Sequence, residues 1–152
     1  MTEKETKKMR KALKSVYFYA LSTSLNDFPQ ATMVQPALTE DWRLLVLSDK
    51  RTKKVRNIQE NDKVWLIADK TGIFKIPKAI YIKGTANLIQ LTKEKFNEVL
   101  SYHGIVTRKI FRSLVKNGFD DSVIIEVIPT KFITLGIFSK SNEQISFQVP
   151  TI

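Results

Sequence analysis

The chain has no cysteine and a single histidine, His103, among its 152 residues. Without cysteine there is no disulfide framework, no thiolate zinc site and no cysteine nucleophile. One histidine excludes a multi-histidine metal site and leaves a histidine triad only one candidate base. No stretch approaches the ~20 apolar residues that cross a membrane. The charged start, MTEKETKKMRKALK, is unlike a secretory signal, so we expect a cytoplasmic protein with no membrane partner.

Positive charge is in excess, because 25 Lys and Arg residues face 15 Asp and Glu residues and give a net charge of +10. A field of this sign attracts anions, which leaves nucleic acid, anionic lipid and phosphorylated small molecules open as ligands. Hydrophobic residues make up 43% of the chain, which is ordinary for a globular protein and excludes a disordered tail. The length predicts one domain over residues 1–152.

Residues 2–15 are predicted to form an N-terminal helix. Thr2 is a suitable N-cap, and Glu5 stands at the spacing of a capping box. Two further helices are predicted, at residues 52–60 and within 92–117, the latter broken near Gly104.

Most of the remaining chain is predicted to form antiparallel strands joined by short polar turns. A turn is expected at 25–29, and Pro129 is expected to separate the last two strands. The strands are expected at 16–23, 30–38, 42–47, 62–69, 79–91, 122–128 and 131–138. This pattern indicates a mainly β fold in which one sheet curls into a barrel over about 16–138. Residues 139–152 are predicted to be a polar tail with one more alternation, at Ile145, Phe147 and Val149.

The segment SDKRTKKVRNI, residues 48–58, follows a predicted strand and opens a predicted helix. Thr52 is the natural N-cap, and Lys53, Lys54 and Arg56 fall in the first helical turn. Cations there oppose the helix dipole, whose N-terminal end is already partly positive. A bound phosphate removes the conflict, since the helix N–H groups and the lysines then share one anion. The alternative is a set of ordinary solvated basic residues.

The segment ATMVQP, residues 31–36, places Pro36 within a strand pattern. Proline cannot donate to a strand ladder, so it indicates a sheet edge, a bulge or the close approach of another molecule. A flat ring lying along this strand is one interpretation, and an ordinary edge strand is the other.

Six short segments together resemble a known family. They are ALST (20–23), PQATMV (29–34), LVLS (45–48), TKKVRNI (52–58), DKV (62–64) and YIKGTA (81–86). Their order and spacing are similar to those of the pyridoxamine 5′-phosphate oxidase-like, FMN-binding split-barrel proteins, over roughly residues 15–90. The resemblance implies a six-stranded antiparallel split β-barrel with peripheral helices. It also implies a homodimer with two flavin sites at the dimer interface.

The resemblance also implies a role for each residue of the basic segment. Lys53 and Lys54 match the pair that holds the FMN phosphate, and Thr52 matches the small hydroxyl residue before it. Ser48 and Asp49 match the turn beside the phosphate and the ribityl chain.

On the ring side, Met33, Val34 and Gln35 match the strand whose backbone lines the isoalloxazine ring. Independently of the family, Lys75 or Lys78 is a candidate cation for the N1–C2 edge of that ring. No catalytic acid or base is identified, since core packing explains Tyr17, Tyr19, Tyr81 and His103 more readily.

Two departures from the vitamin B6 oxidases argue against oxidation of pyridoxamine phosphate. Ala79 stands where those enzymes have a flavin-binding Gln, and no segment rich in Trp, Arg and His follows Phe138. The small-molecule redox substrate is therefore unknown. Some relatives bind a deazaflavin or haem instead of FMN. Haem would need His103 as its axial ligand, but this residue lies on a helical stripe that favours packing.

The leading hypothesis is an FMN-dependent oxidoreductase of unknown substrate. A basic barrel that binds single-stranded nucleic acid is the alternative, with Tyr17, Phe18, Trp42 and Trp65 as candidate stacking residues. A flavin-storage or structural relative without turnover is a third option.

Overall fold

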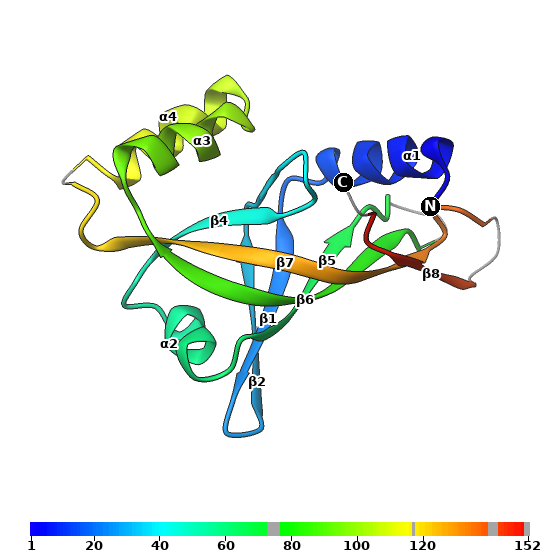
Figure 1. Cartoon of the computed structure of the whole chain (residues 1–152), viewed down its shortest axis with the longest axis horizontal. Helices are drawn as coiled ribbons and strands as arrows, with labels where there is room; N and C mark the ends of the chain where they lie inside the picture. Colours follow the sequence, from blue (N-terminus) through cyan, green and yellow to red (C-terminus); the bar gives the residue numbers. More distant parts are fainter. Residues whose placement is uncertain (73–76, 117, 140–142, 151–152) are drawn as a thin grey trace.

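Figure 1 shows a computed structural model of the chain, which describes residues 1–72, 77–116, 118–139 and 143–150. Within these residues, eight strands form one antiparallel sheet that is accompanied by four helices. The prediction of a mainly β, antiparallel fold with few helices is confirmed. The strands are β1 (Tyr19–Leu25), β2 (Phe28–Val34), β3 (Ala37–Leu38), β4 (Leu44–Asp49), β5 (Lys63–Asp69), β6 (Ala79–Gln90), β7 (Ser122–Leu135) and β8 (Gln144–Gln148). The helices are α1 (Glu3–Lys14), α2 (Lys53–Glu60), α3 (Lys93–Ser101) and α4 (Ile105–Leu114).

The strand order is β2-β1-β5-β6-β7-β4-β3. Strand β8 lies off this path and pairs with the C-terminal part of β7, from Lys131 to Leu135. The long strands β6 and β7 cross the whole molecule in Figure 1. The two ends of the order, β2 and β3, follow one another in the chain and are separated only by Gln35 and Pro36. This connection brings the first and last strands together and curls the sheet.

The main core lies inside the curled sheet, and helices α1 and α2 both contribute to it through Met9, Leu13, Val55 and Ile58. A second, smaller core lies between the α3–α4 pair and the opposite face of the sheet. It is formed by Ala37, Leu45, Leu91, Phe96, Val99, Leu100, Phe111 and Ile124. Helices α3 and α4 are thus held against β3, β4 and β7.

Local signals explain several element boundaries. The Thr2 backbone N–H donates to the Glu5 carboxylate (2.7 Å), and the Glu5 N–H donates to the Thr2 hydroxyl (3.3 Å), so the predicted capping box is present. Strands β1 and β2 form a hairpin whose two turn residues, Asn26 and Asp27, both have positive φ. Such a turn matches the twist of the flanking strands. Gly104 precedes α4 as its N-cap, so the predicted helix break is confirmed.

Several boundaries differ from the prediction. Pro29 lies within β2 opposite Ser24, not in the turn. The strand predicted to contain Pro36 ends at Val34 and gives way to β3. Trp42 lies in the turn before β4 with a φ of 70°, and its ring packs on Phe132 at 5.6 Å. This buried ring contact explains why an aromatic residue occupies a turn.

Pro129 does not separate two strands, because β7 runs through it without a break. The register of β6 and β7 shifts at this point, where Gly84 lies opposite Pro129. The bulge leaves Thr130 without a partner on β6, and a proline is tolerated beside such an irregularity. A Cβ on Gly84 would lie 2.5 Å from the Ile128 carbonyl oxygen, which explains the glycine of the Lys-Gly-Thr-Ala segment.

Strand β8 lies in the segment predicted as a polar tail, and Phe147 places its ring 4.8 Å from that of Phe138. None of the helices in the described part of the chain is long and apolar enough to cross a membrane.

Candidate functional site

Five of the predicted site residues lie where β4 leads into α2. We call residues 48–54 the β4–α2 connection. Ser48 is buried at the end of β4, and its hydroxyl oxygen lies 3.2 Å from that of Thr52. The Thr52 hydroxyl donates to the Asp49 carbonyl (2.9 Å) and makes no capping bond to α2. Helix α2 therefore begins without a side-chain cap and without an acidic residue in its first turn. Its first N–H groups can therefore donate hydrogen bonds to a bound anion.

Asp49 is engaged by Arg51. Its carboxylate accepts hydrogen bonds from the Arg51 backbone N–H (2.8 Å) and from the guanidinium Nε (3.0 Å) and Nη2 (2.5 Å). These bonds lower the pKa of Asp49 to about 2. The one carboxylate of this connection is thus ionised and already paired with Arg51.

Lys54 is half-buried, whereas Lys53 and Arg56 are exposed. Burial lowers the pKa of the Lys54 ammonium, and the charge of Asp49 opposes that shift. Lys54 forms no ion pair with any residue that the structure describes. A partly desolvated cation without a partner is unfavourable unless an anion binds beside it. Lys54 is therefore the side chain of this connection best suited to hold a phosphate.

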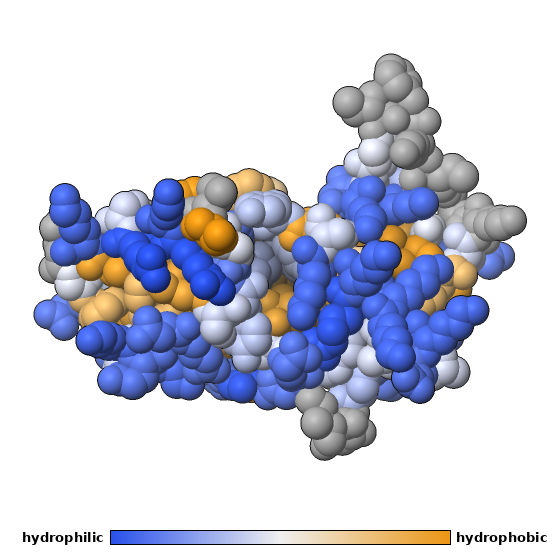
Figure 2. Space-filling model, turned by 90° about the horizontal axis from the view of Figure 1, so that it is seen from above, coloured by the Kyte–Doolittle hydropathy of each residue, from blue (hydrophilic) through white to orange (hydrophobic). Residues whose placement is uncertain are grey.

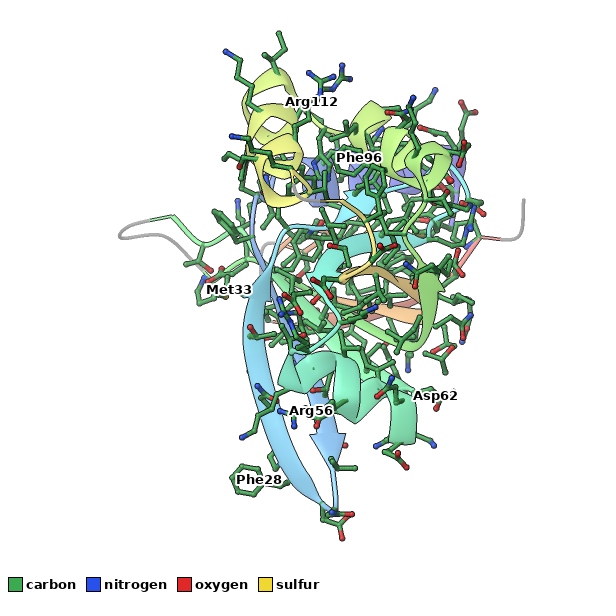
Figure 3. The ribbon with its side chains drawn as sticks, turned by 90° about the vertical axis from the view of Figure 1, so that its left-hand side faces the viewer. Phe28, Met33, Arg56, Asp62, Phe96 and Arg112 are labelled. Carbon is green, nitrogen blue, oxygen red and sulfur yellow. The ribbon has the colours of Figure 1, made fainter. Side chains whose placement is uncertain are left out.

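The predicted ring strand lies beside α2. The Asn57 side chain of α2 donates to Gln30 on β2 (3.2 Å) and to Thr23 on β1 (3.0 Å). Figure 3 shows β2 running past α2, with Met33 farther along the strand than Phe28. The basic helix start and the predicted ring strand thus lie on two neighbouring elements, α2 and β2.

The three residues predicted on the ring strand differ in their surroundings. Met33 is 62% exposed on the outer face of β2, whereas Val34 is buried opposite Tyr19. Gln35 follows the strand, and its amide donates to the Thr107 hydroxyl on α4 (3.0 Å). Thr107 is buried and in turn donates to the Tyr17 hydroxyl (3.4 Å). This chain of hydrogen bonds fixes the connection from β2 to β3 against α4.

A hollow of about 440 Å³ adjoins Gln35 and Pro36. It lies between the end of α1 and the turn from α3 to α4, where Figure 2 shows a depression between two parts of the surface. Its polar lining includes the side chains of Tyr17, Tyr102 and Thr107. A volume of this size and a mixed polar and aromatic lining suit a small molecule.

His103 also lines this hollow, although its Nε2 atom is buried and has no hydrogen-bond partner among the described residues. Its ring meets the Phe111 ring edge-on at 4.9 Å. Burial lowers the pKa of His103, and the nearby charge of Arg108 lowers it further. The imidazole is thus neutral near pH 7. His103 packs on Phe111 as expected, but it lies in the turn between α3 and α4 and not on a helical stripe.

A family model described as pyridoxamine 5′-phosphate oxidase matches residues 5–136. The chain belongs to the pyridoxamine 5′-phosphate oxidase family. The match covers most of the chain and includes both the basic helix start and the ring strand. The antiparallel sheet with few peripheral helices is therefore the split-barrel fold of this family, as the sequence predicted. The described sheet has eight strands, where the resemblance implied six.

Solved structures of similar fold differ in what their names say they bind. General Stress Protein 26 from Bacillus anthracis str. Sterne has a TM-score of 0.67 and 18% identity, over 94% of this chain and 98% of that chain. A FAD-binding protein from Mesorhizobium loti has a TM-score of 0.59 and 14% identity, over 84% and 89%. A heme binding protein from Mycobacterium smegmatis has a TM-score of 0.69 and 12% identity, over 93% and 56%. At these identities the likeness shows the fold alone. No curated protein matches the chain.

Sequence reasoning missed Thr107 and Tyr102 in this member of the pyridoxamine 5′-phosphate oxidase family. Thr107 contacts Gln35 across 72 residues and Tyr17 across 90 residues. No local sequence pattern predicts contacts between residues so far apart in the chain. The one available signal is a threonine on the apolar face of α4, which needs a partner once it is buried.

Two further hollows lie near other predicted residues of this family member. One of about 360 Å³ is lined by Ser48, Asp49 and Arg51, but its opposite wall carries Asp120 and Asp121, so it does not suit a phosphate. The other, of about 320 Å³, is lined by Lys78 and three more lysines. Lys75 lies outside the described residues. None of the three hollows, as formed by the described residues, is lined by Lys53 or Lys54.

The aromatic residues predicted to stack on nucleic-acid bases are not all accessible. Trp42 is only 2% exposed, and its ring lies between Phe132 and the Arg10 guanidinium, which is 4.2 Å from the ring centroid. Trp42 therefore cannot stack on a base. Tyr17, Phe18 and Trp65 are exposed.

Proposed function

We propose that this member of the pyridoxamine 5′-phosphate oxidase family is a flavoprotein that binds FMN and acts as a flavin-dependent oxidoreductase. The observation that carries the proposal is Lys54, a half-buried cation without an ion pair among the described residues, at a helix start that has neither a side-chain cap nor an acid. The family match supports the same assignment, because it includes this segment.

The residues of the β4–α2 connection fit a phosphate monoester. The first N–H groups of α2 donate along the helix axis, and Lys54 supplies a positive charge that is only partly solvated. The hydroxyls of Ser48 and Thr52 stand 3.2 Å apart and both donate to the Asp49 carbonyl, so they hold the turn that leads into the helix. Lys53 is exposed and adds long-range attraction.

The residues of the β2–β3 connection fit the flat ring. Pro36 lacks an N–H, so the chain leaves the ladder at this point. The hydrogen bond from Gln35 to Thr107 holds the connection in place. A bound flavin would supply the hydride and electron chemistry, while the protein supplies position and electrostatics. The hollow of about 440 Å³ beside Gln35 is the space that we assign to the substrate.

The proposal includes a homodimer, because the outer face of the sheet carries an apolar band. Cross-strand partners place five side chains in one row on this face, and each is exposed or half-buried. Trp65, which is 40% exposed, lies beside the row on the same face. The row consists of Met33, Ala20, Ile67, Tyr81 and Ile133.

Met33 belongs both to this apolar band and to the proposed ring strand. A second copy that covers the band would therefore also place its own residues beside β2. This explains why none of the three hollows in a single chain includes Lys54. It supports a flavin site that is completed by the partner subunit.

The experiment is to remove any bound cofactor from the purified protein, add FMN, FAD, a deazaflavin or haem in turn, and titrate each by absorbance and fluorescence. We expect FMN to bind most tightly, with an absorption band at roughly 450 nm that belongs to the flavin. Tighter binding of a deazaflavin would make the deazaflavin the proposed cofactor in place of FMN. A Soret band on addition of haem would make haem the proposed cofactor. A colourless protein that binds none of the four cofactors, yet binds oligonucleotides with a steep salt dependence, would favour the nucleic-acid alternative.

A further inference from the structure

The hollow of about 320 Å³ mentioned above lies away from α2 and is lined by lysines from three parts of the chain. Lys8 and Lys11 come from α1, Lys70 follows β5, and Lys78 precedes β6. Ala12, Gly136 and Ile137 complete the lining. In Figure 2 hydrophilic side chains gather over α1, in the right-hand part of the surface. We call this site the lysine hollow.

The four ammonium groups have no carboxylate partner among the residues that the structure describes. Lys70 donates to the Ser15 hydroxyl (2.6 Å), and Lys8 lies over the Phe138 ring, 4.8 Å from its centroid. Both of these partners are neutral. The ion pairs of the described residues do not involve Lys8, Lys11, Lys70 or Lys78. The remaining residues contain no Asp or Glu, so they add no acidic side chain.

The nearest acid along the chain is already engaged. Asp69 accepts a hydrogen bond from the Thr71 backbone N–H (2.7 Å). Hydrogen bonding from the Thr71 side chain and from its backbone N–H lowers the pKa of Asp69, so this carboxylate is ionised. One ionised carboxylate cannot balance four lysines, so the lysine hollow keeps a net positive charge.

The backbone holds the lysines in this arrangement. The Lys70 N–H donates to the Lys78 carbonyl (2.7 Å), and the Lys78 N–H donates to the Thr71 hydroxyl (3.0 Å), so Lys70 and Lys78 are adjacent. Gly136 has a φ of 62°, and a Cβ there would collide with the Pro77 carbonyl oxygen. The close approach seats the chain before β6 against the turn after β7.

We propose that the lysine hollow binds a compact polyphosphate, either inorganic pyrophosphate or the diphosphate group of a nucleotide. Like charges that converge without a counterion repel one another, and a multivalent anion removes that repulsion. Lysine binds phosphate as a mobile point charge. A ligand with two phosphate groups therefore matches four lysines better than a ligand with one carboxylate does. The volume is at the lower end for small-molecule sites, so a short polyphosphate fits the hollow itself. A long strand would need a continuous groove.

The test is a titration of the full chain with pyrophosphate, followed by calorimetry and by the amide NMR signals of Gly136 and Ile137. ADP is titrated in parallel, and adenosine serves as the ligand without phosphate. We expect pyrophosphate and ADP to shift both amides and adenosine to leave them unchanged. Tighter binding of ADP would assign the nucleotide as the source of the diphosphate, and equal binding would assign the diphosphate alone.

Two variants remove charge from the hollow, and two others serve as controls. Lys70→Gln with Lys78→Gln is expected to weaken pyrophosphate binding roughly tenfold or more, on the scale of lost charge-assisted hydrogen bonds. Lys8→Gln with Lys11→Gln changes only α1, keeps the Lys70–Ser15 contact, and is expected to act in the same direction. Lys93→Gln with Lys109→Gln removes the same charge from exposed positions outside the hollow, and binding should stay within about twofold.

Lys53→Gln with Lys54→Gln separates the lysine hollow from the proposed flavin phosphate site, and it should leave the Gly136 and Ile137 shifts intact. Loss of all pyrophosphate binding in that variant would place the ligand at α2 and overturn the proposal. Equal weakening in the control pair would reduce the effect to net charge and overturn it as well. Binding of an oligonucleotide without binding of pyrophosphate would assign the surface to nucleic acid instead.

Discussion

At the scale of single residues, the arrangement around α2 separates the lysines of the basic segment by burial. Lys53, Arg56 and Lys54 stand in the same helical turn, but only Lys54 is half-buried. An exposed lysine keeps its hydration and contributes little to one contact, whereas a partly desolvated lysine gains more from an anion. The structure therefore ranks residues that the sequence alone treats as equivalent.

Lys54→Met is expected to weaken FMN binding by about 1–3 kcal/mol, the range for losing a hydrogen bond to a charged group. Methionine keeps much of the length of the side chain, so the packing of α2 is preserved. Fluorescence titration with FMN measures the change. Lys93→Met, at an exposed position on α3, is the matched control and should bind as the unmodified protein does. Unchanged affinity in Lys54→Met would remove the proposed phosphate site.

His103 gives a clean pH prediction because it is the only histidine in the sequence. Burial lowers its pKa, so the folded protein favours the neutral imidazole. The folding stability that this preference supplies is complete above the unfolded pKa of about 6.5 and is lost as the pH falls through the lower folded value. NMR titration of the ring should give a midpoint below 6.5. His103→Phe should flatten the fall of the melting temperature between about pH 6.5 and 5.

At the scale of elements, local sequence signals predicted what local interactions decide. The capping box at Thr2, the strands from 62 to 91 and the helix break at Gly104 are all present. Each depends on neighbouring residues in the chain or on a simple alternation of polar and apolar side chains. The basic helix start was also found from sequence, since a cation in a first turn is itself a local conflict.

The errors arose where contacts from elsewhere in the chain decide the structure. Trp42 is in a turn because its ring has a place between Arg10 and Phe132. Pro129 continues β7 because Gly84 on the neighbouring strand lets the backbones approach at a bulge. The hydrogen bonds of Thr107 to Gln35 and Tyr17 likewise depend on how α4 docks. No periodicity in the sequence contains that information.

Gly84→Ala tests the close approach of β6 and β7. The added Cβ would meet the Ile128 carbonyl oxygen, which belongs to the backbone and cannot move aside without disturbing the bulge. We expect the free energy of unfolding to fall by about 1–3 kcal/mol, the usual cost of overpacking. Chemical denaturation measures it. Gly104→Ser is the contrasting change, because nothing lies within 4 Å of its Cβ and serine is a good N-cap. It should be neutral or stabilising.

At the scale of the whole molecule, the split barrel carries an apolar band on the outer face of its sheet. The band from Met33 to Ile133 spans five strands, and one side of it coincides with the proposed ring strand. Dimerisation and flavin binding would then depend on the same surface. A change beside the middle of the band, at a residue outside the proposed phosphate site, should affect both.

Trp65→Lys places a charge in the middle of this outer face. We expect it to produce monomers and to weaken FMN binding at the same time, while the melting temperature of the monomer stays close to its original value. Analytical ultracentrifugation with FMN titration measures both. Phe28→Lys is the control, because Phe28 is 75% exposed at the hairpin tip and lies outside the band. Monomers that retain full FMN affinity would show that one subunit suffices for the site.

Strand β2 has a consequence for the behaviour of the chain in solution. Within the described residues it pairs only with β1, so a row of its backbone groups faces away from the sheet. Such a row is a template on which further strands can assemble into fibrils, and Pro29, which has no N–H to donate, interrupts it at one position only. The proposed homodimer would bring a second copy beside this edge, so we expect monomeric variants to aggregate more readily than the unmodified protein.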